Sequence, residues 1–481
     1  MTSRPGRHPG GRRRGSDRHR GSHRHRGSGR WENGRWDRLT VDLRPLAVPE
    51  FRRLWAAGVV AAVGGSFAVM AVPAQLFQLT GSSAVMAASS TVSFVALLVS
   101  SLGSGVLADT TDRRRLLLTA HSVLALVLGL FWLRGVLDVR SVPLMLVLVA
   151  AQGVALGAVM TTTGAVVPRL VPGELLPAAA ALSSLSRGLG SVTGPLLAGA
   201  LIPLAGLSTL YLLDCAALLT VLWAVFLLPA LPAPPLLPAI ESAHGSGRVL
   251  EGFRYLAAQR VLAAVMGVDL AATAFGLPFS LFPELAVDMF GDPPGGGPAL
   301  GLLCAAYPVG TLATGPVSGG FTRARRHGVW LTGAAVAWGI SLVLLGFAPG
   351  LPLALAALVA GGGVNFVLST FRNAVCQQYT DDALRGRIQG SLTVLLIGGP
   401  QLAGVLHGLV SPGIGPRATV AAGGAATVLA VVVIALTVPA LWRYRSPHEP
   451  LVEHERDGND DQDQQDSHPA ILTALPSPGN Q

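Results

Sequence analysis

The chain alternates between long runs of apolar residues and short segments that carry charges, prolines or glycines. A helix rises about 1.5 Å per residue, so roughly 20 apolar residues cross the hydrocarbon core of a bilayer. The runs show no alternation of polar and apolar positions, which excludes barrel strands and favours helices. The pattern predicts twelve transmembrane helices, near residues 54–79, 84–107, 115–134, 142–166, 176–203, 206–229, 261–290, 298–320, 328–348, 351–376, 388–410 and 417–442.

Arginines divide the connecting segments into two classes. They follow every second run and flank the first and last runs: Arg52, Arg53, Arg113, Arg114, Arg115, Arg169, Arg248, Arg254, Arg260, Arg323, Arg325, Arg326, Arg385, Arg387, Arg443 and Arg445. The other connections carry only Arg134, Arg140 and Arg417. Because basic residues beside membrane helices are retained inside the cell, we predict a multi-pass protein of the cell membrane with both termini in the cytoplasm.

Composition agrees with a membrane protein, since 51% of the residues are hydrophobic and 13% are charged. We predict bundles of six helices at 49–229 and 261–443, a cytoplasmic central loop at 230–260, and disordered tails at 1–48 and 444–481. The first tail, rich in Arg, Gly and His, carries most of the net charge of +9. It either attracts anionic lipid or nucleic acid or is a solvated extension; the extension is favoured, and no nucleic-acid partner is expected.

Enzyme chemistry finds no support in the sequence. There is no P-loop, no Gly-x-Ser-x-Gly segment and no metal-ligand spacing, so neither a metal nor a cofactor is expected. Cys215, Cys304 and Cys376 each lie inside an apolar run and are interpreted as small core residues. If the chain moves a substrate, the absence of a nucleotide-binding motif means that an ion gradient or the gradient of the substrate itself would have to drive the movement.

A charged segment lies between the second and third runs. It reads Gly105-Val-Leu-Ala-Asp109-Thr-Thr-Asp112, followed by three arginines. Asp109 is placed to accept hydrogen bonds from arginines and from a helix N-terminus in the other half, which would hold one conformer closed. We predict a conformational latch formed by Gly105, Asp109, Asp112, Arg113 and Arg114. The alternative is that the cluster only sets the topology.

A six-residue motif occurs in both halves of the chain. Gly194-Pro195-Leu-Leu-Ala-Gly199 lies in the fifth run and Gly399-Pro400-Gln-Leu-Ala-Gly404 in the eleventh. A Gly-Pro pair loosens a membrane helix, whereas small residues also let neighbouring helices approach closely. The six Gly and Pro residues of the two copies are therefore either helix-bending elements or packing sites. Their equivalent positions predict an internal repeat of two six-helix halves.

The segment from Gly105 to Arg115 resembles the signature that members of the major facilitator superfamily carry between their second and third helices. The resemblance covers residues 50–443. It implies an all-α membrane protein of twelve helices in two pseudo-symmetric bundles, a small-molecule substrate, and a monomer.

Within that superfamily, the second half is similar to the enterobactin exporter group. The residues that carry this similarity are Val268-Asp269-Leu270, Phe275-Gly276-Leu277-Pro278, Leu281-Phe282-Pro283, Ser318-Gly319, Arg325-Arg326-His327-Gly328, Phe371-Arg372-Asn373, Gln377-Gln378, Leu384-Arg385-Gly386-Arg387 and Gly398-Gly399-Pro400. After Pro400, however, the chain lacks the acidic stretch typical of the group. The resemblance implies proton-driven siderophore export, with macrolide or multidrug efflux as the alternative. A non-transporting membrane receptor or scaffold is the alternative from another class.

Four ionisable residues lie deep in apolar runs, where a charge costs about 2.5 to 3.5 kcal/mol on insertion scales. They are the candidate proton or substrate residues: Asp269, Asp214, Arg187 and His407. Asp269 suits a proton carrier or a structural pair, and Asp214 a proton site or a hydrogen bond to a neighbouring helix. Arg187 either holds an anionic, catecholate-like group or reaches toward headgroups. His407 is either a core residue, which is favoured, or a relay.

Overall fold

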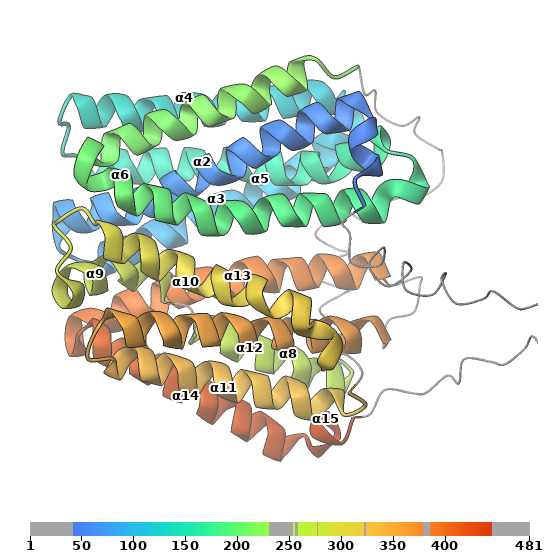
Figure 1. Ribbon diagram of the computed structural model, residues 1–481, viewed down its shortest axis with the longest axis vertical. Helices are drawn as coiled ribbons and strands as arrows, with labels where there is room; N and C mark the ends of the chain where they lie inside the picture. The colour runs from blue at the N-terminus through green and yellow to red at the C-terminus, as the bar shows by residue number, and fades with distance from the viewer. Residues whose placement is uncertain are drawn as a thin grey trace, which may run out of the picture.

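The apolar runs fold into long helices (Figure 1). The computed structural model describes residues 42–229, 254, 258–276, 278–321, 324–378 and 385–444. Within these ranges, only the backbone is described at residues 102, 105, 106, 108–110, 165, 320, 385–395 and 397. The helices are η1 (Arg44–Ala47), α2 (Pro49–Thr80), α3 (Ser83–Thr110), α4 (Arg113–Val136), α5 (Val142–Leu170), η2 (Gly173–Leu175), α6 (Leu176–Phe226), α8 (Arg260–Ala274), η3 (Phe279–Leu281), α9 (Phe282–Phe290), α10 (Pro298–Thr314), η4 (Gly315–Gly320), α11 (His327–Phe347), α12 (Leu351–Gln378), α13 (Arg385–Ile414), α14 (Pro416–Thr437) and α15 (Pro439–Arg443).

Each predicted run corresponds to described helical segments, with local differences. The runs at 176–203 and 206–229 form α6, in which the chain reverses at Gly206, whose φ of 75° and ψ of 167° are accessible to glycine. The run at 261–290 is not one continuous helix, because α8 ends at Ala274 and Pro278 follows. The run at 417–442 is divided before Pro439, which cannot donate a backbone hydrogen bond.

The helices form two bundles, which lie above and below one another in Figure 1. Helices α2 to α6 pack among themselves, and α8 to α14 do the same. The bundles meet mainly along two seams, α3 against α13 and α6 against α10. The predicted all-α membrane fold with two bundles is confirmed. The predicted tails and central loop fall largely outside the described residues, so the domain boundaries stay predictions.

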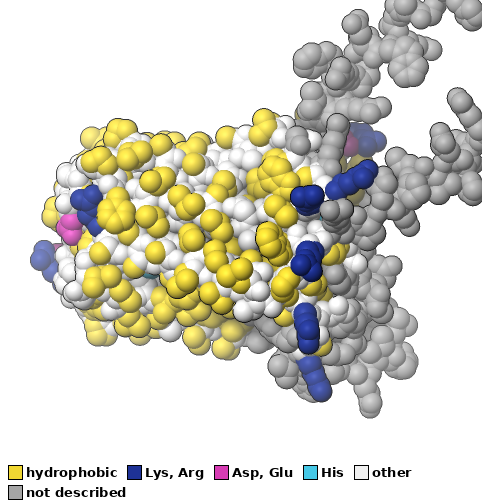
Figure 2. All heavy atoms as spheres, turned by 90° about the horizontal axis from the view of Figure 1, so that it is seen from below, with side chains coloured by type: hydrophobic (Ala, Val, Ile, Leu, Met, Phe, Trp, Pro, Cys, Tyr) yellow, Lys and Arg dark blue, Asp and Glu magenta, His cyan; other side chains and the backbone are white. Residues whose placement is uncertain are grey.

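The two ends of the bundle differ in charge. Arginines gather at the basic end, the end where α3 runs into α4 and where the described chain begins and stops (Figures 1 and 2). At the opposite end, called the far end, the three exceptional arginines have local partners. Arg134 donates to the Val139 carbonyl at 3.0 Å, Arg140 pairs with Asp138 at 3.1 Å, and Arg417 donates to the Ala348 carbonyl at 2.9 Å. Each of the three far-end arginines therefore has a hydrogen-bond partner within the protein.

Candidate transport site

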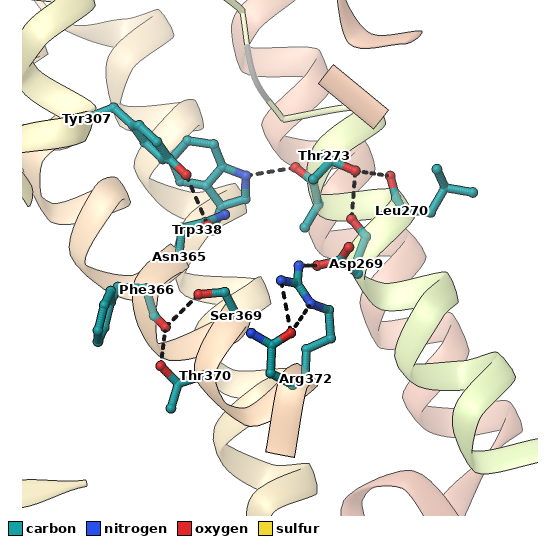
Figure 3. A network of polar contacts seen from close by, with 12 residues as sticks. Asp269, Leu270, Thr273, Tyr307, Trp338, Asn365, Phe366, Ser369, Thr370 and Arg372 are labelled. Atoms are coloured by element: carbon teal, nitrogen blue, oxygen red, sulfur yellow. Dashed lines mark hydrogen bonds and ion pairs between the residues drawn. The ribbon is translucent and has the colours of Figure 1, made fainter. Parts of the chain in front are cut away.

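Asp269 forms a buried ion pair with Arg372 (Figure 3). Arg372 on α12 donates from Nη1 to Oδ1 of Asp269 on α8 at 2.5 Å, and the two side chains are only 7% and 5% exposed. Oδ1 of Asn373 accepts two longer hydrogen bonds, both 3.4 Å, from Nε and Nη2 of Arg372. A guanidinium can be buried in low-dielectric surroundings when an opposite charge and a neutral acceptor both partner it.

Arg372 was missing from the residues that sequence reasoning selected. The signal was present, because this arginine lies within the predicted membrane run 351–376. In the sequence it stands out only within the resemblance to the exporter group. The structure shows that it carries the charge that neutralises Asp269.

A polar strip continues from this pair along α12 and α10. Asn365 lies two helical turns before Arg372 and accepts a hydrogen bond of 3.0 Å from the hydroxyl of Tyr307 on α10 (Figure 3). One turn further along α10, the Thr311 hydroxyl bonds the Gly362 carbonyl at 3.3 Å. The strip therefore links the ion pair to the helix that forms one side of the α6–α10 seam.

The break in the 261–290 run is supported by side chains of three other helices. Trp338 on α11 donates to the Ala272 carbonyl at 2.8 Å, and Thr427 on α14 donates to the Ala271 carbonyl at 3.5 Å. The His407 ring on α13 lies beside the Phe275 carbonyl, because a β-carbon at Gly423 would lie 2.4 Å from that carbonyl oxygen and 2.6 Å from His407 Nε2. The Ala271 carbonyl already accepts the helical hydrogen bond of the Phe275 N–H, whereas carbonyls in the last turn that lack a helical partner need such substitutes in a membrane interior. His407 thus packs in the core of the second bundle, against the end of α8.

Asp214 lies apart from the other candidate groups. It is 2% exposed on α6, where α6 crosses α2 in the first bundle. A β-carbon at Gly64 of α2 would lie 3.3 Å from Oδ1 of Asp214, which shows how closely the helices pack there. Oδ1 itself makes no hydrogen bond to the residues that the structure describes.

Arg187 is exposed and belongs to a polar face of α6. Its Nη2 donates to the Ser184 hydroxyl at 3.0 Å, and Ser191 follows at helical spacing on the same face. The opposite face of the helix is apolar and exposed, formed by Leu185, Leu189 and Leu196. An apolar exposed face suits lipid, which leaves the polar face for the interior of a transport path.

Arg187 and Thr311 lie at the same depth in the bundle. Gly188 of α6 contacts Leu312 of α10, since a β-carbon at Gly188 would lie 2.8 Å from Leu312 Cδ2. Arg187 and Thr311 each precede one of these contact residues by one position. The two helices run antiparallel, so a step of one residue back from the contact turns both side chains to the same side of the seam. Arg187 therefore lies on the same side of the α6–α10 seam as Thr311 of the polar strip.

The two Gly-Pro motifs occupy equivalent places in the two bundles. The first glycine of each copy packs within its own bundle, Gly194 against Ser66 and Gly399 against Thr273. The last glycine of each copy faces the other bundle, Gly199 against Gly301 and Gly404 against Ser90. Both helices continue through their prolines. Close packing is therefore visible in this conformer, and the bending role stays a prediction.

The predicted latch has local contacts within the first bundle. Asp112 caps the N-terminus of α4 by accepting a hydrogen bond of 2.8 Å from the Arg114 backbone. The guanidinium of Arg114 donates to the Phe226 carbonyl at 2.5 Å and lies over its ring. The side chain of Asp109 and the surroundings of Gly105 lie outside the described part of the structure. The predicted role of these two residues, and of Arg113, in holding the two halves together stays a prediction.

A family model described as a transmembrane secretion effector matches residues 40–457. The chain belongs to this family of major facilitator transporters. It is 27% identical over 399 residues to the enterobactin exporter EntS of Citrobacter koseri, covering 83% of this chain and 94% of that relative. The corresponding Escherichia coli exporter is also 27% identical, over 82% of this chain and 94% of its own length.

Solved transporters share the fold at low identity. A bacterial homologue of the iron transporter ferroportin has a TM-score of 0.59 at 17% identity, over 80% of this chain and 98% of its own. The POT family transporter PepTSo has a TM-score of 0.64 at 12% identity, over 82% and 98%. The family confirms that the chain is a multi-pass membrane transporter of small molecules and not an enzyme.

Proposed function

We propose that this transporter exports a siderophore from the cytoplasm by alternating access, driven by protons. The observation that carries the proton part is the buried Asp269–Arg372 pair. Similarity to enterobactin exporters over most of both chains supports the substrate class. The chain carries both bundles, so a monomer suffices for transport, and no nucleic-acid partner is proposed.

The basic end is proposed to face the cytoplasm. Basic residues are retained on that side, and the far-end arginines that break the pattern have local partners. Both termini then lie in the cytoplasm, since the described chain begins and stops at the basic end (Figure 1).

The conformer is proposed to be inward-facing. Contacts between the bundles include Gln78 with Pro294, Gly199 with Gly301, and Gly408 with Ala87, all toward the far end. A transporter that is closed at the far end and open to substrate at the basic end is in one of the two states that alternating access requires. The glycines at the seams let backbones approach closely enough to close it.

The substrate is proposed to bind on the polar faces of α6 and α10. Arg187 presents a planar guanidinium that can bind two oxygens of an anionic group. Tyr307 and Thr311 lie on the facing helix, and the Phe279 ring lies 6.4 Å from that of Tyr307. These groups suit an oxygen-rich ligand with flat apolar parts. The latch residues of the 105–114 segment would act at the basic end when the transporter opens outward.

Asp269 is proposed to carry the proton. When it is ionised, its pair with Arg372 joins α8 to α12; when it is protonated, that attraction is lost. Two arrangements of these helices would then differ in proton content, which is what coupling needs. Asp214 is a second candidate for this role, because its buried Oδ1 is unpaired among the described residues.

Inside-out membrane vesicles with an acidic interior test the proposal. Wild-type protein should accumulate an iron-free catecholate siderophore, and a protonophore should abolish accumulation. A macrolide serves as the competing substrate. Accumulation of the macrolide alone would overturn the siderophore assignment while leaving a proton-driven exporter.

A charge-matched variant separates folding from coupling. Asp269→Asn alone leaves Arg372 buried and unpaired, whereas Asp269→Asn with Arg372→Gln removes both charges at similar volume. The double variant should still equilibrate the siderophore across the membrane but not concentrate it. Protonophore-sensitive accumulation by the double variant would exclude Asp269 as the proton carrier.

A further inference from the structure

Glu284 joins helices of both bundles at the far end. It is partly buried on α9, and its Oε2 accepts a hydrogen bond of 3.2 Å from Ser411 on α13. The Ser83 hydroxyl, at the first residue of α3, lies within reach of the same carboxyl group. We propose that Glu284 is a positioning residue for transport, which latches the far end shut by holding α3 of the first bundle.

Both hydroxyl partners are buried. Ser83 is 3% exposed and Ser411 is 2% exposed, so each needs a hydrogen-bond partner inside the protein. A carboxylate accepts hydrogen bonds more strongly than a neutral group. The negative charge of the carboxylate is also favoured beside the first turn of α3, because a helix leaves its first backbone N–H groups without partners of its own. Asp288, one turn further along α9, is exposed and adds a second negative charge nearby.

The latch lies at the end of a tightly packed seam. A β-carbon at Gly408 of α13 would lie 2.5 Å from the Ser83 carbonyl oxygen and from the Ala87 β-carbon on α3. One turn below, a β-carbon at Gly404 would lie 3.0 Å from the Ser90 hydroxyl. Glu284 therefore acts where α3 and α13 are already in contact.

The two serines differ in what opening would do to them. Ser411 and Glu284 belong to the same bundle, so their hydrogen bond survives a movement of one bundle against the other. Ser83 belongs to the first bundle, and its contact with Glu284 must break when the far end opens. This difference gives a matched pair of variants, Ser83→Ala and Ser411→Ala. Each removes one serine hydroxyl from the surroundings of the same carboxylate.

Cys304 provides a native reporter. It lies on α10 about two turns from the far end, one turn before Tyr307 on the polar face. In a background with Cys215→Ser and Cys376→Ser, a membrane-impermeant maleimide added outside intact cells should label Cys304 slowly. Ser83→Ala and Glu284→Ala should raise the rate about tenfold, the effect of losing a hydrogen bond to a charged group. Ser411→Ala should stay within about twofold of the background, since it breaks no contact between bundles.

Three results would overturn the latch: rapid labelling in the background protein, no increase in Ser83→Ala, or equal increases in Ser83→Ala and Ser411→Ala. The inference rests on the proposed inward-facing transporter, but its readout needs neither siderophore nor proton gradient. A latch confirmed by labelling, together with no siderophore transport, would show that only the substrate assignment had failed. Normal siderophore transport with unchanged labelling in Ser83→Ala would reject the latch alone.

Discussion

Gly199 and Gly301 lie against each other across the seam between the bundles. A β-carbon added to Gly199 would lie 2.7 Å from the Gly301 Cα, and one added to Gly301 would lie 2.6 Å from the Pro195 carbonyl oxygen. Real β-carbons do not approach backbone atoms this closely. The seam can therefore close at this level only if both positions lack side chains.

Replacing Gly301 should accordingly favour the outward-open state. Gly301→Ala forces α10 away from α6, so external labelling of Cys304 should increase and net export should fall. Gly333→Ala on α11 is the control, because a β-carbon there meets nothing within 4 Å. Equal labelling of the two variants would contradict a closed seam at Gly301.

Arg372→Ala should destabilise the folded protein by about 3 to 5 kcal/mol, because it leaves the buried Asp269 carboxylate unpaired. Asp269→Ala combined with Arg372→Ala should recover part of that loss. Thermal unfolding of the detergent-solubilised variants measures both effects. If the single variant unfolds at the wild-type temperature, the pair does not stabilise this conformer.

Arg187→Gln should weaken binding of an anionic siderophore without changing thermal stability, since Arg187 is exposed and bonds only to Ser184 through the contacts described. Arg187→Lys keeps the charge but loses the planar fork, so it should recover binding only in part. Equilibrium binding to solubilised protein gives the comparison. Unchanged affinity in Arg187→Gln would remove Arg187 from the substrate site.

Trp338→Phe should lower stability by about 1 to 3 kcal/mol, because the Ala272 carbonyl loses its side-chain partner in a buried place. Phenylalanine retains most of the ring, which limits the added effect of a cavity. Thermal unfolding again provides the measurement. Trp330→Phe is a suitable control, since Trp330 is 43% exposed. A larger effect at Trp330 would show that the hydrogen bond to Ala272 is not what matters.

Much of the fold could be predicted from the sequence, because the determinants are local. The length of each apolar run gives a crossing helix, and the alternation of arginines indicates which connections share a side. The repeated Gly-Pro motifs indicated equivalent helices in two halves, and the structure places Gly199 and Gly404 at equivalent seams. The break at Phe275 to Pro278 was missed, although Gly276 and Pro278 were visible signals within the run.

The sequence by itself determined a helical membrane protein with a repeated architecture, since hydrophobic length and charge distribution depend only on neighbouring residues and the bilayer. Only the tertiary structure decided which ionisable groups meet. Asp269 and Arg372 are 103 positions apart, and Glu284 and Ser411 are 127 apart. Such pairs depend on how whole helices pack and turn about their axes, and helical periodicity within one segment does not specify the partner.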